Sequence, residues 1–197
     1  MIFGPKLFYL VRPRDQATVQ ARLGIMVDGL VYAGMMLSFL ALIRKNDIAH
    51  GAHWLYLACM IAWLGDTFAY AFGRLLGRFV PAKLYPSVSP GKTWIGAVGG
   101  LCGSFMGCVI LSKGWIFPGI WSFPELGWAH GAVITIVGGM LGQSGDLTES
   151  LLKRIWGVKD SNVLIPFPGH GGWLDRLDAL IFVAPWIYIY ATLIWHP

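Results

Sequence analysis

Residues 144–178 read SGDLTESLLKRIWGVKDSNVLIPFPGHGGWLDRLD, and they contain half of the ten acidic residues of the chain. The segments on either side are almost entirely apolar. Because a charge near lipid is costly, a protein that gathers its charged side chains in one stretch usually handles ions or carries out chemistry there. This stretch therefore interrupts the apolar segments and is the first candidate for a functional site.

The first part of the stretch has the spacing of an amphipathic helix. At about 100° per residue, Asp146, Ser150 and Lys153 fall on one face, with Glu149 beside them. The opposite face carries three apolar side chains, Leu147, Leu151 and Ile155. We expect a cytoplasmic amphipathic helix whose polar face binds ions or phosphates and whose apolar face packs or contacts lipid.

The composition is that of an integral membrane protein. Hydrophobic residues make up 56% of the chain and charged residues 13%, whereas soluble domains carry about 25% charged residues. The apolar runs predict an all-α, polytopic bundle of about five transmembrane helices. These lie at residues 24–43, 53–72, 94–111, 129–147 and 177–195. Residues 1–23 are assigned to an interfacial N-terminal segment, because their apolar patch is too short to cross a bilayer, and residues 24–197 to one membrane-embedded domain.

The Lys and Arg residues are concentrated in alternate segments between the predicted spans. Most of them lie in the N-terminal segment, the 73–93 loop and the 148–176 loop. By the positive-inside rule these three segments share the cytoplasmic side. We predict a multi-pass protein of the inner (cytoplasmic) membrane whose site faces the cytoplasm. Nucleic-acid binding is disfavoured despite the net charge of +5, because the basic residues sit in loops between spans.

Two polar features lie upstream of the charged stretch. Asp66 falls deep in the second predicted span, where an acid must face the protein interior and find a cation or a hydrogen-bond partner. Residues 89–93, SPGKT, have the composition of a helix start, whose backbone N–H groups could hold phosphate together with Lys92. The glycines of the next span indicate close helix packing. They are Gly96, Gly99, Gly100, Gly103 and Gly107.

A glycine-rich turn, GHGG at residues 169–172, stands just before Asp175, Arg176 and Asp178. Such a turn lets the backbone approach a ligand and could return Asp175 to the site of Asp146. Two carboxylates from separate elements are a usual way to hold Mg²⁺ for phosphate chemistry. Zinc is disfavoured, because His170 is the only His nearby and no Cys lies close.

These residues belong to one long pattern, S-x-x-K-R, then K-D, and later H-G-G-x-x-D-R-x-D. Its members are Ser150, Lys153, Arg154, Lys159, Asp160, His170, Gly171, Gly172, Asp175, Arg176 and Asp178. Upstream, Asp66-Thr67 and the SPGKT segment extend the pattern. Together they resemble the signature of the phosphatidate cytidylyltransferase (CDP-diacylglycerol synthase) family.

The resemblance implies a nucleotidyltransferase of phospholipid biosynthesis that transfers CMP from CTP to phosphatidate, giving CDP-diacylglycerol and pyrophosphate. It also implies Mg²⁺ and K⁺ as cofactors, and a homodimer among membrane lipids. By position, Asp146 and Asp175 correspond to metal-binding carboxylates. The implied catalytic residues are Lys153, Lys159, Asp160 and Asp175, and the implied substrate-binding residues are Ser89, Lys92, Ser150, Arg154, His170, Arg176 and Asp66.

The sequence departs from the family pattern at a few points. Residues 165–169, IPFPG, place two extra residues before His170, and Ile95 stands where the family often has Glu. The insertion raises the question of whether Asp175 still reaches Asp146. Family members are also usually longer, with further spans before the matched region.

Two other functions remain open at this point. One is a CTP-dependent cytidylyltransferase that acts on another lipid phosphate, of the archaeol or polyprenol type. The other is a non-catalytic membrane protein for ion binding or transport, which would place acids along several spans. The acids of this chain instead cluster on one side, which favours an enzyme.

Overall fold

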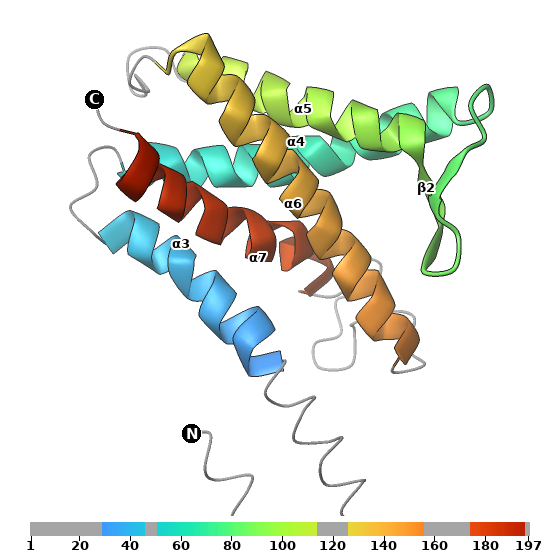
Figure 1. The fold of residues 1–197 in the computed structure, drawn as a ribbon, viewed down its shortest axis with the longest axis horizontal. Helices are drawn as coiled ribbons and strands as arrows, with labels where there is room; N and C mark the ends of the chain where they lie inside the picture. The colour runs from blue at the N-terminus through green and yellow to red at the C-terminus, as the bar shows by residue number, and fades with distance from the viewer. Residues whose placement is uncertain (1–28, 46–50, 114–125, 156–173, 196–197) are drawn as a thin grey trace, which may run out of the picture.

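The computed structural model describes residues 29–45, 51–113, 126–155 and 174–195 (Figure 1). In chain order the elements are η1 (Leu30–Met35, a π-helix), α3 (Met36–Lys45), α4 (Gly51–Leu76), β1 (Lys83–Tyr85), β2 (Ser89–Thr93), α5 (Trp94–Ser112), α6 (Trp128–Ile155), α7 (Leu174–Ile189) and η2 (Tyr190–Ile194, a π-helix). The predicted all-α bundle is confirmed, and one short β-hairpin is added to it.

The helices are arranged around α6, which runs obliquely across the bundle in Figure 1. The most extensive contact is between α4 and α5, which lie side by side. Helix α7 packs against α6 on one side and against α3 on the other. The hairpin follows α4, leads into α5 and stands beside the C-terminal half of α6.

Within the described residues, three helical segments are long and apolar enough to cross a membrane, which makes this an integral membrane protein. They are Gly51–Leu76, Trp94–Ser112 and Leu177–Ile194, and they match three of the predicted spans. The helical segment Leu30–Arg44 is apolar but shorter. The first predicted span begins outside the described residues, so the total of about five spans and their orientation stay predictions.

Helix α6 differs from the prediction. The sequence suggested a span at residues 129–147 followed by a separate cytoplasmic helix, but α6 runs without interruption from Trp128 to Ile155. A helix of its 28 residues is about 42 Å long, which exceeds the roughly 30 Å of a bilayer core. One helix can therefore contain both parts. The predicted separation of an apolar and a polar face on this part of α6 is confirmed, since Leu151 and Ile155 are exposed on one side while Glu149 is buried.

The glycines of α5 allow it to approach α4 closely, as predicted. A Cβ atom at Gly99 would lie 2.5 Å from the Cβ of Phe72 on α4. At Gly103 it would collide with the carbonyl oxygen of Leu64. Lipid supplies little hydrophobic force between helices, so contact through small residues is what joins such a pair.

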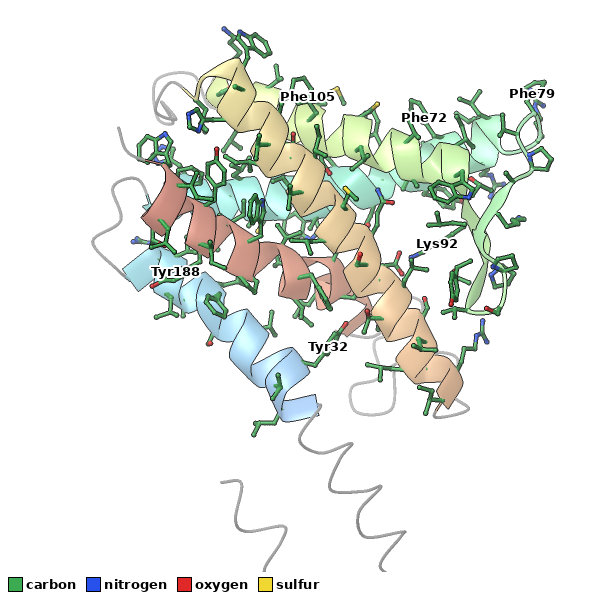
Figure 2. All side chains as sticks on the ribbon, in the orientation of Figure 1. Tyr32, Phe72, Phe79, Lys92, Phe105 and Tyr188 are labelled. Carbon is green, nitrogen blue, oxygen red and sulfur yellow. The ribbon has the colours of Figure 1, made fainter. Side chains whose placement is uncertain are left out.

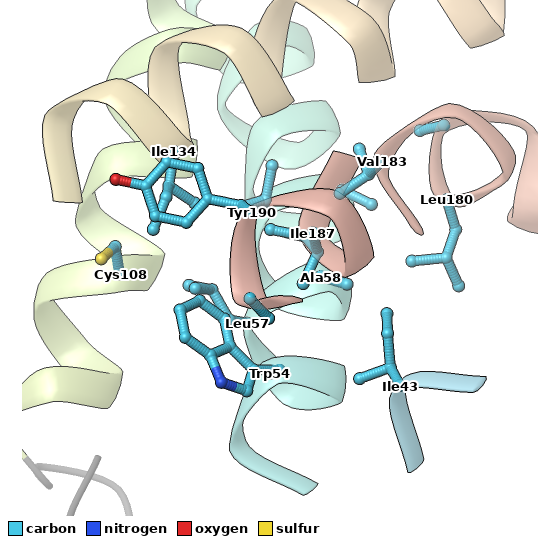
Figure 3. Close-up of a cluster of buried hydrophobic side chains, with 14 of the residues drawn as sticks. Ile43, Trp54, Leu57, Ala58, Cys108, Ile134, Leu180, Val183, Ile187 and Tyr190 are labelled. Atoms are coloured by element: carbon cyan, nitrogen blue, oxygen red, sulfur yellow. The ribbon is translucent and has the colours of Figure 1, made fainter. Parts of the chain in front are cut away.

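The hydrophobic core lies where α4, α6 and α7 meet, at the end of the bundle where α4 begins (Figure 3). Trp54 is fully buried, and its ring centroid is 6.4 Å from that of Tyr190 and 5.5 Å from that of Trp195. The indole of Trp186 donates a hydrogen bond of 3.1 Å to the carbonyl oxygen of Ile134, which fixes α7 against α6.

The SPGKT segment corrects another expectation. These residues form strand β2, which pairs antiparallel with β1 through Lys83–Thr93 and Tyr85–Ser89, and do not start a helix. Thr93 alone caps α5, since its hydroxyl oxygen accepts a 3.1 Å hydrogen bond from the Gly96 amide. Pro90 is tolerated because each strand of a two-stranded sheet is an edge strand.

Candidate active site

Three carboxylates come together where α6 and α7 meet. Oxygen atoms of Asp146, Glu149 and Asp178 all lie within 4.8 Å of one another. Glu149 is only 2% exposed and Asp178 only 5% exposed, whereas Asp146 is half-buried. Three acids held this close repel one another unless cations offset their charge, and carboxylate oxygens are the ligands that Mg²⁺ and Ca²⁺ prefer. The cluster therefore fits a hard divalent cation.

A glycine brings the third acid into place. Asp146 and Glu149 lie one turn apart on α6, but Asp178 comes from α7. A Cβ atom at Gly145 would collide with the carbonyl oxygen of Asp178. The two helices thus touch through the backbone at this point. The carboxylate of Asp178 accepts a 2.7 Å hydrogen bond from the Ala179 amide.

Two lysines offset part of this negative charge. Lys92 Nζ lies 2.5 Å from Asp146 Oδ2, and Lys153 Nζ lies 3.2 Å from Glu149 Oε2. Lys153 shares α6 with its partner, whereas Lys92 reaches across from β2, as Figure 2 shows. Neither of these two ion pairs includes Asp178, so a cation at the cluster would add a partner for the third acid.

The hairpin is fastened to α6 as well as to α5. Arg154, near the end of α6, donates a hydrogen bond of 3.4 Å from its Nε atom to the carbonyl oxygen of Val88, between the two strands. This contact and the Lys92–Asp146 pair both hold the hairpin against α6. The position of Lys92 is therefore set by tertiary contacts at both ends of β2.

A cavity of about 380 Å³ opens beside Lys92. It is lined by residues of α4, the hairpin, α5 and α6: Asp66, Ala69, Tyr70, Gly73, Arg74, Leu84, Ser89, Gly91, Lys92, Thr93, Gly96, Ala97, Gln143 and Asp146. Gln143 donates a 2.9 Å hydrogen bond to the carbonyl oxygen of Ala97 and so ties α6 to α5 within this wall. The cavity thus contains acids, cations and neutral polar groups.

The sequence matches the model of the cytidylyltransferase family over residues 1–194. The chain belongs to the cytidylyltransferase family. It is 41% identical to a phosphatidate cytidylyltransferase of Staphylococcus saprophyticus over 160 residues, which cover 81% of this chain and 55% of that protein. It is 36% identical to a phosphatidate cytidylyltransferase of Bacillus subtilis over 187 residues, which cover 95% of this chain and 64% of that protein.

A phosphatidate cytidylyltransferase of Brucella abortus is 37% identical over 169 residues, which cover 86% of this chain and 57% of that protein. The chain thus spans between about half and two thirds of the length of these curated relatives. The resemblance inferred from the sequence motifs is confirmed at the level of the family.

Several predicted site residues of this cytidylyltransferase-family chain meet in the cavity. Asp66, Ser89, Lys92 and Asp146 all line it, although they come from three different elements. The prediction that Asp66 faces the protein interior is refined, because its side chain is exposed at the cavity.

The other predicted site residues fall into two groups. Ser150, Lys153 and Arg154 lie on α6 past the acid cluster, and Arg154 contacts the hairpin backbone. Lys159, Asp160 and His170 lie outside the described residues. Asp175 and Arg176 belong to the first turn of α7, but their side chains lie outside the described set, so the pairing of Asp175 with Asp146 stays a prediction.

Sequence reasoning did not assign Glu149 and Asp178 to the metal site. The signal was present in the spacing, because Glu149 follows Asp146 by three residues and Asp178 follows Asp175 by three, which places each pair on one helical face. Gln143 was also missed, although it lies three residues before Asp146 on the same helix. The sequence did not indicate that α7 brings Asp178 to the polar face of α6.

Proposed function

We propose that this chain carries the cytidylyltransferase reaction, with CTP and phosphatidate as substrates and CDP-diacylglycerol and pyrophosphate as products. An oxygen of the phosphatidate phosphate forms a bond to the α-phosphorus of CTP. The bond from this phosphorus to the bridging oxygen breaks, and the electron pair leaves with pyrophosphate. The family match supports this reaction class, and the lipid is inferred from the relatives, which are phosphatidate cytidylyltransferases.

The observation that carries the proposal is the meeting of the acid cluster with Lys92 at a cavity. Both substrates are anions, so the main obstacle is to bring two phosphate groups together. Lys92 lines the cavity, where it would offset phosphate charge, and Lys153 is paired with Glu149 of the acid cluster. Asp146, Glu149 and Asp178 would hold Mg²⁺, which when bound offsets the phosphate charge further.

The remaining expectations belong to the same proposal. K⁺ beside Mg²⁺ and assembly into a homodimer follow from the family resemblance alone. The cytoplasmic orientation follows from the loop charges, since Lys92 and Lys153 lie in two of the basic segments. A site on that side would have access to both nucleotide and membrane lipid.

The test is pyrophosphate release and CMP transfer by the full-length purified protein in detergent micelles, with radiolabelled CTP, Mg²⁺ and phosphatidate. We expect Asp178→Asn and Glu149→Gln to lower turnover about 100-fold or more, the range seen when one preorganised electrostatic group is removed. Thr148→Ala is the matched control, because Thr148 stands between the two α6 acids in the sequence but donates its hydrogen bond to the Ser144 carbonyl of its own helix.

Three outcomes would contradict the proposal. Near wild-type, Mg²⁺-dependent turnover by Asp178→Asn would mean that Asp178 does not take part in the catalytic site. Turnover with an ether-linked archaeol phosphate or a polyprenol phosphate, but not with phosphatidate, would replace the lipid substrate. Mg²⁺ binding without CTP-dependent chemistry on any lipid phosphate would favour a non-catalytic ion-binding protein.

A further inference from the structure

One stripe of helix α4 forms part of the cavity wall. Asp66, Tyr70 and Arg74 follow one another at intervals of four residues, so they share one helical face, and all three line the cavity. All three are also exposed. The stripe therefore links the interior of the cavity to the outer surface of α4.

The same stripe continues into an apolar surface. Trp63, seven residues before Tyr70 and on the same face, is 53% exposed, and Tyr70 itself is 66% exposed. Both belong to a helix that is long and apolar enough to cross a membrane. In a bilayer, exposed aromatic side chains on such a helix would contact lipid, which would place acyl chains beside the α4 wall of the cavity.

Arg74 stands at the end of this stripe, in the last turn of α4. Its Nη1 atom donates a 2.9 Å hydrogen bond to the hydroxyl oxygen of Tyr70, which holds the guanidinium at the cavity wall. A guanidinium has five N–H donors in a planar fork, and this contact uses one of them. The geometry of the fork matches the oxygens of a phosphate group.

The two cations of the cavity wall differ in what they bind. Lys92 is paired with Asp146 at the acid cluster. Arg74 makes no ion pair with any acid in the described part of the chain, and its guanidinium contacts the neutral phenol of Tyr70. An uncompensated cation beside a lipid-facing opening attracts an anionic headgroup.

We propose that Arg74, held by Tyr70, binds the phosphate monoester of the lipid substrate as it enters from the membrane. The lipid phosphate would then lie at the α4 side of the cavity, with its acyl chains along the Trp63 surface, while the nucleotide phosphates occupy the side of Lys92. This subsite rests on the proposed function. A terminal phosphate of CTP has similar chemistry, and the apolar surface beside Arg74 favours the lipid.

The chain offers a matched control in Arg78, one turn further along. Arg78 is exposed as well, but it does not line the cavity, and its Cζ atom lies 4.7 Å from the ring centroid of Phe79. Arg74→Gln and Arg78→Gln therefore remove the same charge from neighbouring turns. Only the first change removes a cation from the cavity.

The kinetic test measures the KM for phosphatidate in mixed micelles at saturating CTP, and the KM for CTP at saturating lipid. We expect Arg74→Gln to raise the KM for phosphatidate about 10- to 100-fold, the loss that follows removal of a hydrogen bond to a charged group. The KM for CTP should change less than about twofold, and Arg78→Gln should leave both values near those of the wild type. A rise in the KM for CTP alone would assign Arg74 to the nucleotide, and equal effects of the two variants would leave only a general charge effect.

A binding measurement separates this subsite from the proposed reaction. Radiolabelled phosphatidate is bound to the purified protein in detergent without CTP, with diacylglycerol as the lipid that lacks the phosphate. We expect wild-type protein and Arg78→Gln to prefer phosphatidate, and Arg74→Gln to lose that preference. If the wild type prefers phosphatidate but turns over no lipid phosphate, the proposed reaction fails and the subsite stands. If Arg74→Gln keeps the preference, the subsite is wrong whatever the activity.

Discussion

At the end of the bundle where α4 begins, Trp54 is completely buried against Tyr190 and Trp195, whereas at the other end α6 and α7 meet through Gly145 and bring three acids together, of which Asp146 lines the cavity. Large rings thus fill one end, whereas at the other end the backbones of α6 and α7 touch, with the ring of Phe182 beside Gly145. The difference shows how a small membrane bundle can combine rigidity with a site. The packed end fixes the helices, and the glycine contact sets the distance between their charged residues.

The comparison predicts that the packed end carries stability and no chemistry. Trp54→Ala should lower the free energy of unfolding by about 3 kcal/mol, the lower end of the range for truncating a buried Trp, because lipid makes the unfolded reference state apolar as well. Unfolding in detergent followed by circular dichroism measures the change. Trp63→Ala on the exposed face of the same helix is the control and should cost much less.

Binding of Mn²⁺ to the folded Trp54→Ala protein, followed by electron paramagnetic resonance, should match that of the wild type. A loss of metal affinity with the fold intact would mean that the two ends are coupled, and the comparison would fail.

At the polar end, replacing a glycine of α6 by alanine should disturb the acid cluster only at Gly145. A methyl group there collides with the Asp178 backbone, so Gly145→Ala should destabilise the protein by about 2 kcal/mol and weaken Mn²⁺ binding by moving Asp178. Gly142→Ala is the matched control one turn earlier, since its Cβ would lie 3.4 Å from Val183 Cγ2, an ordinary contact. Equal losses of Mn²⁺ affinity in both variants would show that the site does not depend on this approach.

The smallest expected effect concerns the lysine that bridges the hairpin and α6. The ammonium group of Lys92 forms an ion pair with the carboxylate of Asp146, so a metal ion must compete with it for this carboxylate. Lys92→Met should tighten Mn²⁺ binding in the absence of nucleotide about fivefold, which corresponds to an ion pair of about 1 kcal/mol. Lys83→Met, an exposed lysine on β1, should change nothing.

Weaker Mn²⁺ binding in Lys92→Met would mean that the lysine supports the metal site and does not compete with the ion. Some group other than Lys92 would then have to offset the repulsion among the acids before the metal binds.

Much of the fold could be read from local pattern. The apolar runs located α4, α5 and most of α7, because a helix that crosses lipid must be long and apolar. The glycine spacing indicated the close α4–α5 contact. Two features were misread for local reasons: SPGKT has the composition of a helix start but pairs with β1, and the charges after Asp146 suggested a new helix although α6 continues.

The candidate site was only partly predictable. Asp66, Ser89, Lys92 and Asp146 were selected from motifs, and all four line one cavity. Glu149 and Asp178 were not assigned to a metal, and Arg74 was not singled out. Their importance depends on which helices lie next to each other, and this information is spread over many contacts far apart in the sequence.

For the charged residues 144–178, some properties were determined by the sequence and others only by the tertiary structure. By itself, the sequence determined that the chain is a helical membrane protein, that its charges gather in a few segments, and that one face of α6 is polar, because lipid penalises charge and a helix repeats every 3.6 residues. Only the tertiary structure decided that Asp178 joins Asp146 and Glu149, that Lys92 reaches Asp146 from a hairpin, and that Arg74 lines the same cavity as Lys92. These meetings depend on the backbone contact at Gly145 and on the contacts that hold the hairpin against α6, and both join segments that are far apart in the sequence.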